Sequence, residues 1–206
     1  MISKESFSAN VSHETIQRLE AFEALLLKWN PRINLISKSD TDRVWQRHIL
    51  DSAQIFDHVD QPVTTWLDLG SGGGFPGIVC AILALENRSS VNFHLVESDT
   101  RKAIFLRQAA SDLSLPVLVH AMRIEAFGGG AVDVITARAL AALPELLDLS
   151  QKHIGPDTQL LFPKGRKAET ELVQASLSWD MKVQRIPSLT DSEATILRLS
   201  GVTRRP

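Results

Sequence analysis

From residue 62 onward, short apolar segments alternate with longer segments in which apolar residues recur every three or four positions. The first pattern is typical of buried strands, and the second is typical of helices that cover them. Their alternation predicts an α/β fold with a mostly parallel sheet and helices on both faces. We expect strands at residues 64–69, 91–97, 117–121, 132–136, 158–163, 181–186 and 194–200, with helices between them at about 76–86, 99–113, 139–153 and 167–178. The last two strands leave no room for a helix between them, so one of them should be antiparallel.

The N-terminal part of the chain has only the helical pattern. A helix over residues 13–29 is expected to end at Asn30-Pro31, because proline disfavours a helical residue before it. A second helix is expected over about 41–57, with His48 on its apolar side. An interior role for His48 is favoured over a functional one. We therefore expect helices in residues 1–61 that cap a compact Rossmann-like unit of residues 62–206.

The composition restricts the possible cofactors, cellular location and partners of the protein. The 206 residues include a single cysteine, Cys80, which excludes an internal disulfide framework and a cysteine-rich zinc site. No apolar stretch is long enough to cross a membrane, and residues 1–10 lack the pattern of a secretory signal. A cytoplasmic protein without a membrane partner is expected. The net charge of −2 means that any contact with nucleic acid must use a local basic patch.

The stretch from Trp66 to Gly77 is the strongest motif in the chain. A buried strand runs into Gly70-Ser71-Gly72-Gly73-Gly74, and Phe75-Pro76-Gly77 then begins a helix. Glycines allow a sharp turn and a close approach of the backbone to a ligand. The free amides of a helix start favour an anionic or carboxylate-bearing group. This stretch therefore predicts a site for a nucleotide-type cofactor, with Gly70 and Gly72 in contact with it.

Asp68 distinguishes between two kinds of cofactor. The glycines satisfy G-x-G-x-x-G, and Glu97 follows Gly77 by twenty residues, as in dinucleotide-binding enzymes. However, a carboxylate at Asp68 would repel a pyrophosphate, whereas it suits a ligand with a cationic amino-acid end. S-adenosylmethionine is such a ligand, and its sulfonium is also positive. We therefore favour S-adenosylmethionine over NAD.

Other candidate residues follow the carboxyl ends of the predicted strands, where such sheets bind ligands. Glu97 ends the second strand, and its carboxylate is expected to accept the ribose hydroxyls. Ile124 and Glu125 follow the third strand and are expected to flank an adenine edge. Phe75 could pack on the cofactor, although a core role is equally compatible with the sequence.

Arg138 follows the fourth strand, at the expected rim of the site. One interpretation is a fork that holds a carboxylate or phosphate, and we favour it. The alternative is a structural arginine paired with Asp68 or Glu125. We assign no catalytic acid or base, because a ring nitrogen such as guanine N7 attacks a methyl sulfonium without losing a proton first. Cys80 lies within a helix and is expected to be buried and inert.

Basic residues gather near the same edge of the predicted sheet. Of these, we single out Arg47, Arg123 and Lys164 as candidate RNA contacts. Individually such residues are often solvated surface charges, but together they could hold an RNA backbone with salt-sensitive affinity. The wider set at this edge comprises Arg43, Arg101, Lys102, Arg107, Arg166 and Lys167, and two further candidates, Arg204 and Arg205, lie near the end of the sequence.

Several motifs together resemble a known family. They are Lys28-Trp29-Asn30-x-x-Ile33-Asn34-Leu35, Arg47-His48-Ile49-Leu50-Asp51-Ser52, Asp68 to Gly77, Glu97-Ser98-x-x-x-Lys102-x-x-Phe105-Leu106, Arg123-x-Glu125, Asp133 to Ala139 with Thr136-Ala137-Arg138, and Pro163-Lys164-Gly165. Over nearly its whole length the chain resembles the bacterial 16S rRNA guanine-N7 methyltransferases, the glucose-inhibited division protein B family. The N-terminal motifs and Thr-Ala-Arg-Ala are specific to that family, whereas the glycine loop belongs to a wider superfamily.

The resemblance implies a class I S-adenosylmethionine-dependent methyltransferase with an N-terminal helical extension. It implies methylation of N7 of one guanine, guanine 527, in the 530 loop of the 16S rRNA decoding region. Residues that match Gly70, Phe75, Ile124-Glu125 and Arg138 line the cofactor site in that family. The expected partner is 16S rRNA or the small ribosomal subunit, and a monomer without a DNA partner or a metal is expected.

Two other functions remain open from the sequence. A non-catalytic RNA-binding or ribosome-assembly module could use the same fold as a scaffold, and it would show no methyl transfer. A small NAD-dependent oxidoreductase would bind NAD, but it would leave Asp68 without an explanation.

Overall fold

The computed structural model describes residues 3–60, 62–86 and 90–206. Residue 61, at the expected boundary between the N-terminal helices and the rest, lies outside these ranges, as do residues 1 and 2. The helices are α1 (Lys4–Ser8), α2 (His13–Ile33), α3 (Leu50–Phe56), α4 (Gly77–Glu86), α5 (Thr100–Asp112), α6 (Leu143–Ser150) and α7 (Ala168–Ala175). The strands are β1 (Thr65–Leu69), β2 (Asn92–Glu97), β3 (Val117–Ala121), β4 (Val132–Ala137), β5 (Ile154–Lys164), β6 (Trp179–Pro187) and β7 (Thr195–Arg204).

All seven strands form one sheet in the order β3-β2-β1-β4-β5-β7-β6. Strands β1 to β5 run parallel, and β7 is antiparallel to both β5 and β6. The predicted antiparallel strand is therefore confirmed, and so is the mostly parallel seven-stranded sheet. The order reverses direction between β1 and β4, and this switch point is where open α/β sheets bind ligands.

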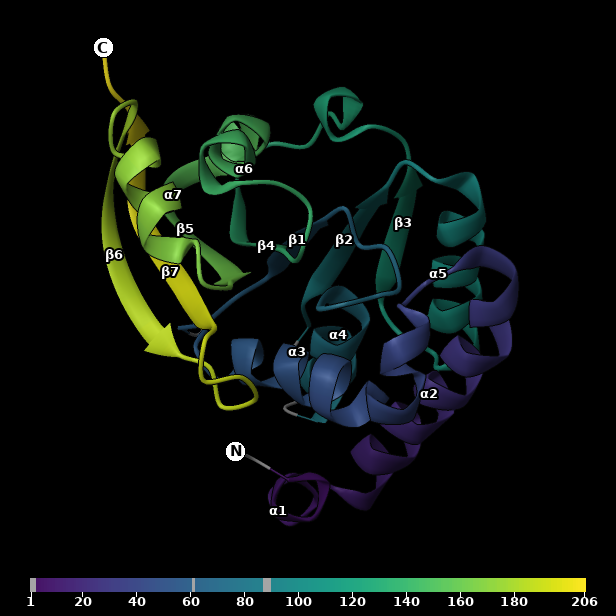
Figure 1. Cartoon of the computed structure of the whole chain (residues 1–206). Helices are drawn as coiled ribbons and strands as arrows, with labels where there is room; N and C mark the ends of the chain where they lie inside the picture. The colour runs from purple at the N-terminus through teal and green to yellow at the C-terminus, as the bar shows by residue number, and fades with distance from the viewer. Residues whose placement is uncertain (1–2, 61, 87–89) are drawn as a thin grey trace.

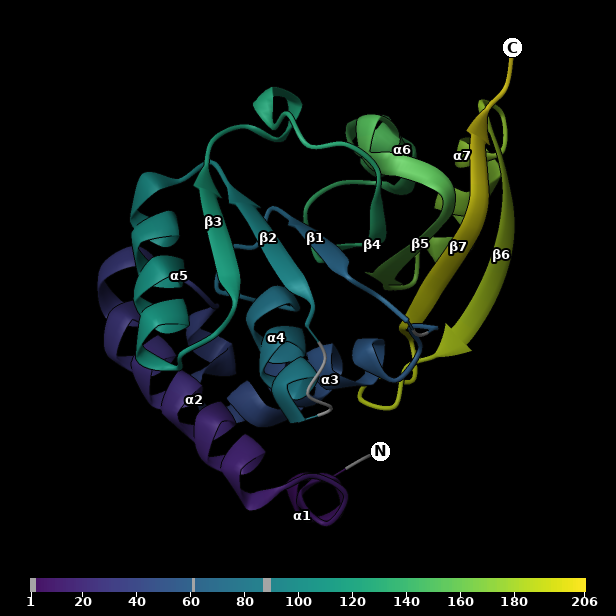
Figure 2. The same ribbon diagram turned by 180° about the vertical axis from the view of Figure 1, so that it is seen from behind.

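Helices cover the sheet on both sides, and α2 to α5 lie on the opposite side from α6 and α7 (Figures 1 and 2). Side chains alternate along a strand, so Trp66 packs toward the first group of helices and Leu67 toward the second. Both are fully buried. This double burial explains why β1 is apolar at nearly every position.

The N-terminal helices share the core of the sheet. Leu19, Phe22 and Leu26 of α2 are fully buried and belong to the same apolar cluster as Ile78 of α4 and Phe105 of α5. Their spacing of three and four residues is the helical pattern seen in the sequence. Because α2 has this packed face, the segment that follows it is held at a defined place on the α/β core.

The predicted end of the first helix is wrong. Helix α2 continues through Pro31 to Ile33, and Asn34 ends it in the left-handed conformation with φ of 51°. Pro31 has no amide to donate to the Leu27 carbonyl, but the helical turn still closes after it because the Asn34 amide donates to the Asn30 carbonyl at 3.0 Å. The buried Asn30 side chain also accepts from the Leu35 and Ile36 amides at 2.7 and 2.9 Å.

The second predicted helix is divided into three pieces. A 3₁₀ segment, η1 (Lys38–Arg43), precedes a π-helical turn, η2 (Trp45–Ile49), and only α3 is α-helical. Single π turns inside helices frequently accompany functional sites. The predicted helix over 139–153 is also shorter than expected, since α6 begins at Leu143 and residues 138–142 form a loop. Both irregular segments contribute residues to a cleft at the carboxyl ends of the parallel strands.

Candidate functional site

A large cleft lies at the carboxyl ends of the parallel strands, with a volume of about 890 Å³. The loop after β1, the ends of β2 and β5, the loop after β4 and the irregular segment before α3 all contribute to its wall. Every residue that the sequence singled out for cofactor or RNA lines it: Gly70, Gly72, Phe75, Glu97, Ile124, Glu125, Arg138, Arg47, Arg123 and Lys164. The topology therefore brings together residues that are scattered over 118 positions of the chain.

One side of the cleft, which we call the glycine cradle, consists of residues 70–73 and Glu97. The Gly70 amide donates to the Val96 carbonyl at 2.9 Å, which ties the turn to β2. The Glu97 carboxylate accepts from the Gly72 amide at 2.8 Å and from the Asp99 amide at 2.7 Å. Each carboxylate oxygen keeps a further lone pair for a ligand hydroxyl. Glu97 thus shapes the cradle and still offers an acceptor to the cleft.

Gly70 is required by both its conformation and its surroundings. Its φ is +64°, in the left-handed region that favours glycine. A Cβ added there would lie 2.7 Å from Leu140 Cδ1, in the loop after β4. Gly72 also has positive φ, but an added Cβ would meet only the Gly70 carbonyl oxygen, at 3.7 Å. The space beside the Gly72 backbone is therefore open to a ligand.

Asp68 does not face the cleft, contrary to the role expected from the sequence. Its side chain is fully buried beneath the cradle, and Thr136 Oγ1 donates to Asp68 Oδ1 at 2.7 Å. Trp66 Nε1 donates to the same Thr136 hydroxyl at 3.0 Å. Burial raises the pKa of Asp68 to about 6, from an ordinary 3.8. Asp68 therefore acts on the cleft through its buried charge and its packing against Gly77, and makes no direct contact with a ligand.

Another side of the cleft, which we call the arginine rim, comprises Arg47, His48, Asp51, Phe75 and Arg138. Arg138 Nη1 donates to Asp51 Oδ2 at 3.2 Å and to the Arg47 carbonyl at 3.1 Å. The Arg138 guanidinium also lies over the Phe75 ring, 4.9 Å from its centroid. The sequence alternative that paired Arg138 with Asp68 or Glu125 is wrong, because Asp51 forms its ion pair. Burial lowers the pKa of Arg138.

His48 is more than a satisfied interior residue. Arg138 Nη2 lies 2.8 Å from His48 Nδ1, and a guanidinium only donates, so Nδ1 must be an acceptor. Burial, followed by the positive charge of Arg138, lowers the pKa of His48 to about 4. The neutral ring stacks on Phe75 with centroids 5.0 Å apart. Its Nε2 has no hydrogen-bond partner among the described residues, and lies 3.6 Å from Asp40 Oδ2.

Lys164 is already engaged by protein groups. Its ammonium forms an ion pair with Glu171 at 2.9 Å and donates to the Ala141 carbonyl at 2.7 Å, and only 9% of its side chain is exposed. Glu171 also accepts from the Leu143 amide at 2.8 Å, at the start of α6. These contacts hold the loop over residues 138–142 against the cleft. The position of Lys164 in the cleft fits the sequence, but its ammonium is not free for RNA.

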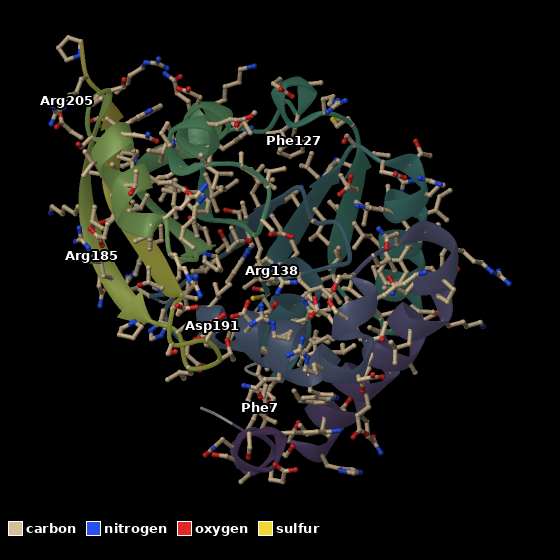
Figure 3. All side chains as sticks on the ribbon, viewed as in Figure 1. Phe7, Phe127, Arg138, Arg185, Asp191 and Arg205 are labelled. Atoms are coloured by element: carbon tan, nitrogen blue, oxygen red, sulfur yellow. The ribbon has the colours of Figure 1, made fainter. Side chains whose placement is uncertain are left out.

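Most other basic residues proposed for an RNA surface are neutralised by carboxylates. The pairs are Arg43–Asp40, Arg47–Asp191, Arg101–Asp99, Arg166–Glu193, Arg204–Asp148 and Arg205–Asp180. Figure 3 shows Arg138 near the centre of the molecule, with Arg205 at the outer edge of the sheet. Arg123 and Lys102 line the cleft, and neither side chain has a hydrogen bond or ion pair among the described residues. They are the free positive charges of the cleft.

Cys80 is fully buried, as predicted, and burial raises the pKa of its thiol well above the usual value. Within the described ranges, no group of three or more His, Cys, Asp or Glu side chains is arranged to hold a metal ion. The helices of the same ranges include none with the length and apolar character needed to span a bilayer.

The partners of Arg138 could not be identified from the sequence. Asp51 and His48 lie in the motif from Arg47 to Ser52. The helical periodicity of this segment does not indicate that they contact Arg138, which follows β4. Asp40 and Asp191 also line the cleft and were not considered. The available signal was the density of charged and imidazole side chains in an otherwise apolar helical segment.

The strand order with β7 antiparallel and the glycine loop at the switch point agree with a class I methyltransferase fold, and solved S-adenosylmethionine-dependent methyltransferases share this fold. The family described as rRNA small subunit methyltransferase G matches residues 15–197. The chain belongs to this family. The resemblance found in the sequence motifs is thereby confirmed.

Relatives in several bacteria support this assignment. A protein of Cereibacter sphaeroides (strain ATCC 17029) named ribosomal RNA small subunit methyltransferase G is 49% identical over 193 residues, which cover 94% of each chain. A protein of the same name from Parvibaculum lavamentivorans is 47% identical over 206 residues, covering 98% of this chain and 91% of the other.

Solved structures resemble the chain in fold. A SAM-dependent methyltransferase from Aquifex aeolicus has a TM-score of 0.60 at 14% identity, covering 79% of this chain and 94% of the other. A TehB-like SAM-dependent methyltransferase from Corynebacterium glutamicum has a TM-score of 0.54 at 15% identity, covering 73% and 87%. Both likenesses support the fold class, which is that of S-adenosylmethionine-dependent methyltransferases.

Proposed function

We propose that this protein transfers a methyl group from S-adenosylmethionine to N7 of a guanine in the 530 loop of 16S rRNA. The observation that carries the proposal is one cleft whose wall contains both the glycine cradle and the arginine rim. A class I fold and membership of a small-subunit rRNA methyltransferase family agree with this chemistry. Family membership also argues against the NAD-dependent oxidoreductase that the sequence left open.

The residues present fit S-adenosylmethionine. The open backbone at Gly72 accommodates a ligand against the cradle, and Glu97 keeps lone pairs for the ribose hydroxyls. Ile124, which is buried, and Glu125 would flank the adenine, and the Arg138 guanidinium would receive the carboxylate. When bound, this cofactor supplies a methyl group activated by a positively charged sulfur.

Methylation of guanine N7 does not require a general acid or base from the protein. The residues of the cleft would hold guanine N7 in line with the methyl group that the bound cofactor supplies. The nitrogen–carbon bond would form as the carbon–sulfur bond breaks, and the positive charge would pass from sulfur to the purine. No proton leaves, so alignment and exclusion of water supply the rate. The neutral state of His48 suits this cleft, because an imidazolium would add repulsion next to Arg138 and a sulfonium. We assign no catalytic residue.

The guanine must leave its stack to enter a cleft of this kind. Arg123 is exposed and free, and Arg47 is half exposed, so we propose both as contacts to the RNA backbone. Lys164 shapes the cleft through Glu171, and we assign it to that role instead. We further propose that the protein acts as a monomer in the cytoplasm on 16S rRNA or the small subunit.

The test is transfer of labelled methyl from S-adenosylmethionine to unmodified 16S rRNA and to small subunits. Cleavage selective for N7-methylguanine would map the product, with Gly70→Asp as the inactive control because of the close contact at Leu140. A single cleavage in the 530 loop, lost in the control, is expected. Cofactor binding without label in either RNA would overturn the rRNA assignment. Absence of cofactor binding would favour the non-catalytic module.

A further inference from the structure

A second, smaller groove lies between α2 and α5 and has a volume of about 310 Å³. The two helices run side by side at the same edge of the molecule in both ribbon views (Figures 1 and 2). The groove is lined by Leu25, Lys28, Trp29, Arg32, Gln108 and Asp112. None of these residues belongs to the cleft that holds the proposed reaction.

Trp29 forms the aromatic part of this groove. Its ring packs on Phe105 of α5 with centroids 5.8 Å apart, which fixes its orientation. The residue is only half buried, and within the described ranges its indole N–H has no acceptor. The groove therefore presents a rigid aromatic surface with a free donor. Bases of unpaired RNA stack on such surfaces regardless of their identity.

The groove also carries two free positive charges. Lys28 and Arg32 lie one helical turn apart on α2, and neither has an ion pair or side-chain hydrogen bond among the described residues. Earlier in the same helix, Arg18 is paired with Glu14 at 2.7 Å. The single acid of the groove, Asp112, accepts from Gln108 at 2.7 Å. Positive charge therefore exceeds negative charge at this place, although the whole chain has a net charge of −2.

The end of α2 and the residues that follow it link the groove to the large cleft along the chain. Arg32 precedes the last residue of α2, and Leu35 and Ile36, a few positions later, line the cleft. The side chain of the buried Asn30 holds both of their amides, so the link between groove and cleft is a fixed one. Lys102, near the start of α5, adds a free positive charge on the cleft side.

We propose that the groove between α2 and α5 binds an unpaired segment of the RNA substrate next to the target guanine. A base packs against Trp29, and the flanking phosphates bind Lys28 and Arg32. This inference rests on the proposed function, because it takes RNA to be the substrate. It adds a binding site outside the cleft and explains how an acidic protein holds a polyanion.

The test compares charge reversals in and away from the groove. Lys28→Glu and Arg32→Glu are each expected to weaken binding of an RNA fragment that contains the 530 loop by about 5- to 20-fold. Each should reduce the slope of log affinity against log salt by about one. The matched control is Lys182→Glu, on the exposed face of β6 at the opposite edge of the molecule, which should change binding less than about twofold.

The aromatic contact needs its own variant. Trp29→Ala is expected to weaken RNA binding by about tenfold without changing the salt slope, because stacking involves no counterion release. Trp29→Phe keeps the packing on Phe105 and should retain part of the affinity. All groove variants should bind S-adenosylmethionine with unchanged affinity and retain their rate at saturating RNA.

Two outcomes separate this inference from the proposed function. If the wild-type protein methylates 16S rRNA and the groove variants behave like Lys182→Glu, the inference is overturned while the function stands. If the wild-type protein transfers no methyl to 16S rRNA, the proposed function fails. The direct binding measurement then still reports on the groove.

Discussion

The two sides of the large cleft are built in different ways. The glycine cradle is a backbone structure, in which main-chain amides of consecutive residues contact the carboxylate of Glu97 and the carbonyl of Val96. The arginine rim is a side-chain structure, in which Arg138 contacts residues that lie about 90 positions earlier in the chain. One side depends on local conformation and the other on the packing of two distant segments.

This difference indicates how each side would respond to change. A backbone cradle tolerates few substitutions, because an added side chain fills the space meant for a ligand or a neighbour. A side-chain rim depends on hydrogen-bond donors with fixed geometry, so the shape of a cation matters as well as its charge. The four predictions below test this distinction.

The largest effect is expected at the rim. Arg138→Ala should lower methyl transfer by about 100-fold, because Asp51 and His48 lose their shared partner and the fork proposed for the cofactor carboxylate is removed. Arg138→Lys should recover little, since an ammonium cannot make the same set of contacts. Arg185→Ala, a surface ion pair on β6, is the control and should be fully active. Wild-type activity in Arg138→Lys would show that only the charge matters.

The next effect concerns pH and involves both sides. The pKa of Asp68 is about 6 in the fold against 3.8 ordinarily, so its stabilising contribution is present below pH 4 and is lost as pH rises through 6. The pKa of His48 is about 4 against 6.5, so its contribution is present above pH 6.5 and is lost as pH falls through 4. The two contributions change in opposite directions with pH. Each changes the free energy of unfolding by about 3 kcal/mol over its full range.

Single variants should expose each trend. Relative to wild type, the free energy of unfolding of Asp68→Asn should rise between pH 4 and 6.5, and that of His48→Gln should fall. Urea unfolding over this range measures both. Parallel curves for the three proteins would contradict the opposed contributions.

A third prediction concerns the helix start beneath the cradle. Gly77→Ala should reduce the free energy of unfolding by about 1–3 kcal/mol, because the new Cβ would lie 2.7 Å from the buried Asp68 Oδ2. The matched control is Gly130→Ala, where an added Cβ has no atom within 4 Å, and it should change stability by less than about 0.5 kcal/mol. Equal stability of the two variants would show that the cradle has more freedom than its contacts indicate.

The smallest effect is expected at the exposed end of the rim. Arg47 pairs with Asp191 at 3.1 Å, and both side chains are more than a third exposed. Asp191→Asn should therefore change stability by less than about 1 kcal/mol. It should strengthen RNA binding by about twofold, because it frees Arg47 and removes a negative charge from the cleft. Weaker binding would indicate that Asp191 positions Arg47 for RNA.

Much of the fold was predictable because it depends on local patterns. Runs of apolar residues gave the strands, and the short connection between the last two gave the antiparallel pairing. The parallel sheet then placed Glu97, Ile124 and Arg138 at one edge, since carboxyl ends of parallel strands meet there. The predicted helix over 41–57 was wrong in detail, because periodicity cannot distinguish an α-helix from the 3₁₀ and π turns that replace it.

The candidate site also has some features that local sequence patterns determine and others that they do not. By itself the sequence determined the glycine cradle, since positive φ and close approach leave a local signature of glycines. It also determined which residues end the strands. Only the tertiary structure decided that Asp68 is buried, that Asp51 and His48 hold Arg138, and that Lys28 and Trp29 border a second groove. Those outcomes depend on how segments distant in sequence pack together, and no local pattern encodes the partner that a side chain meets.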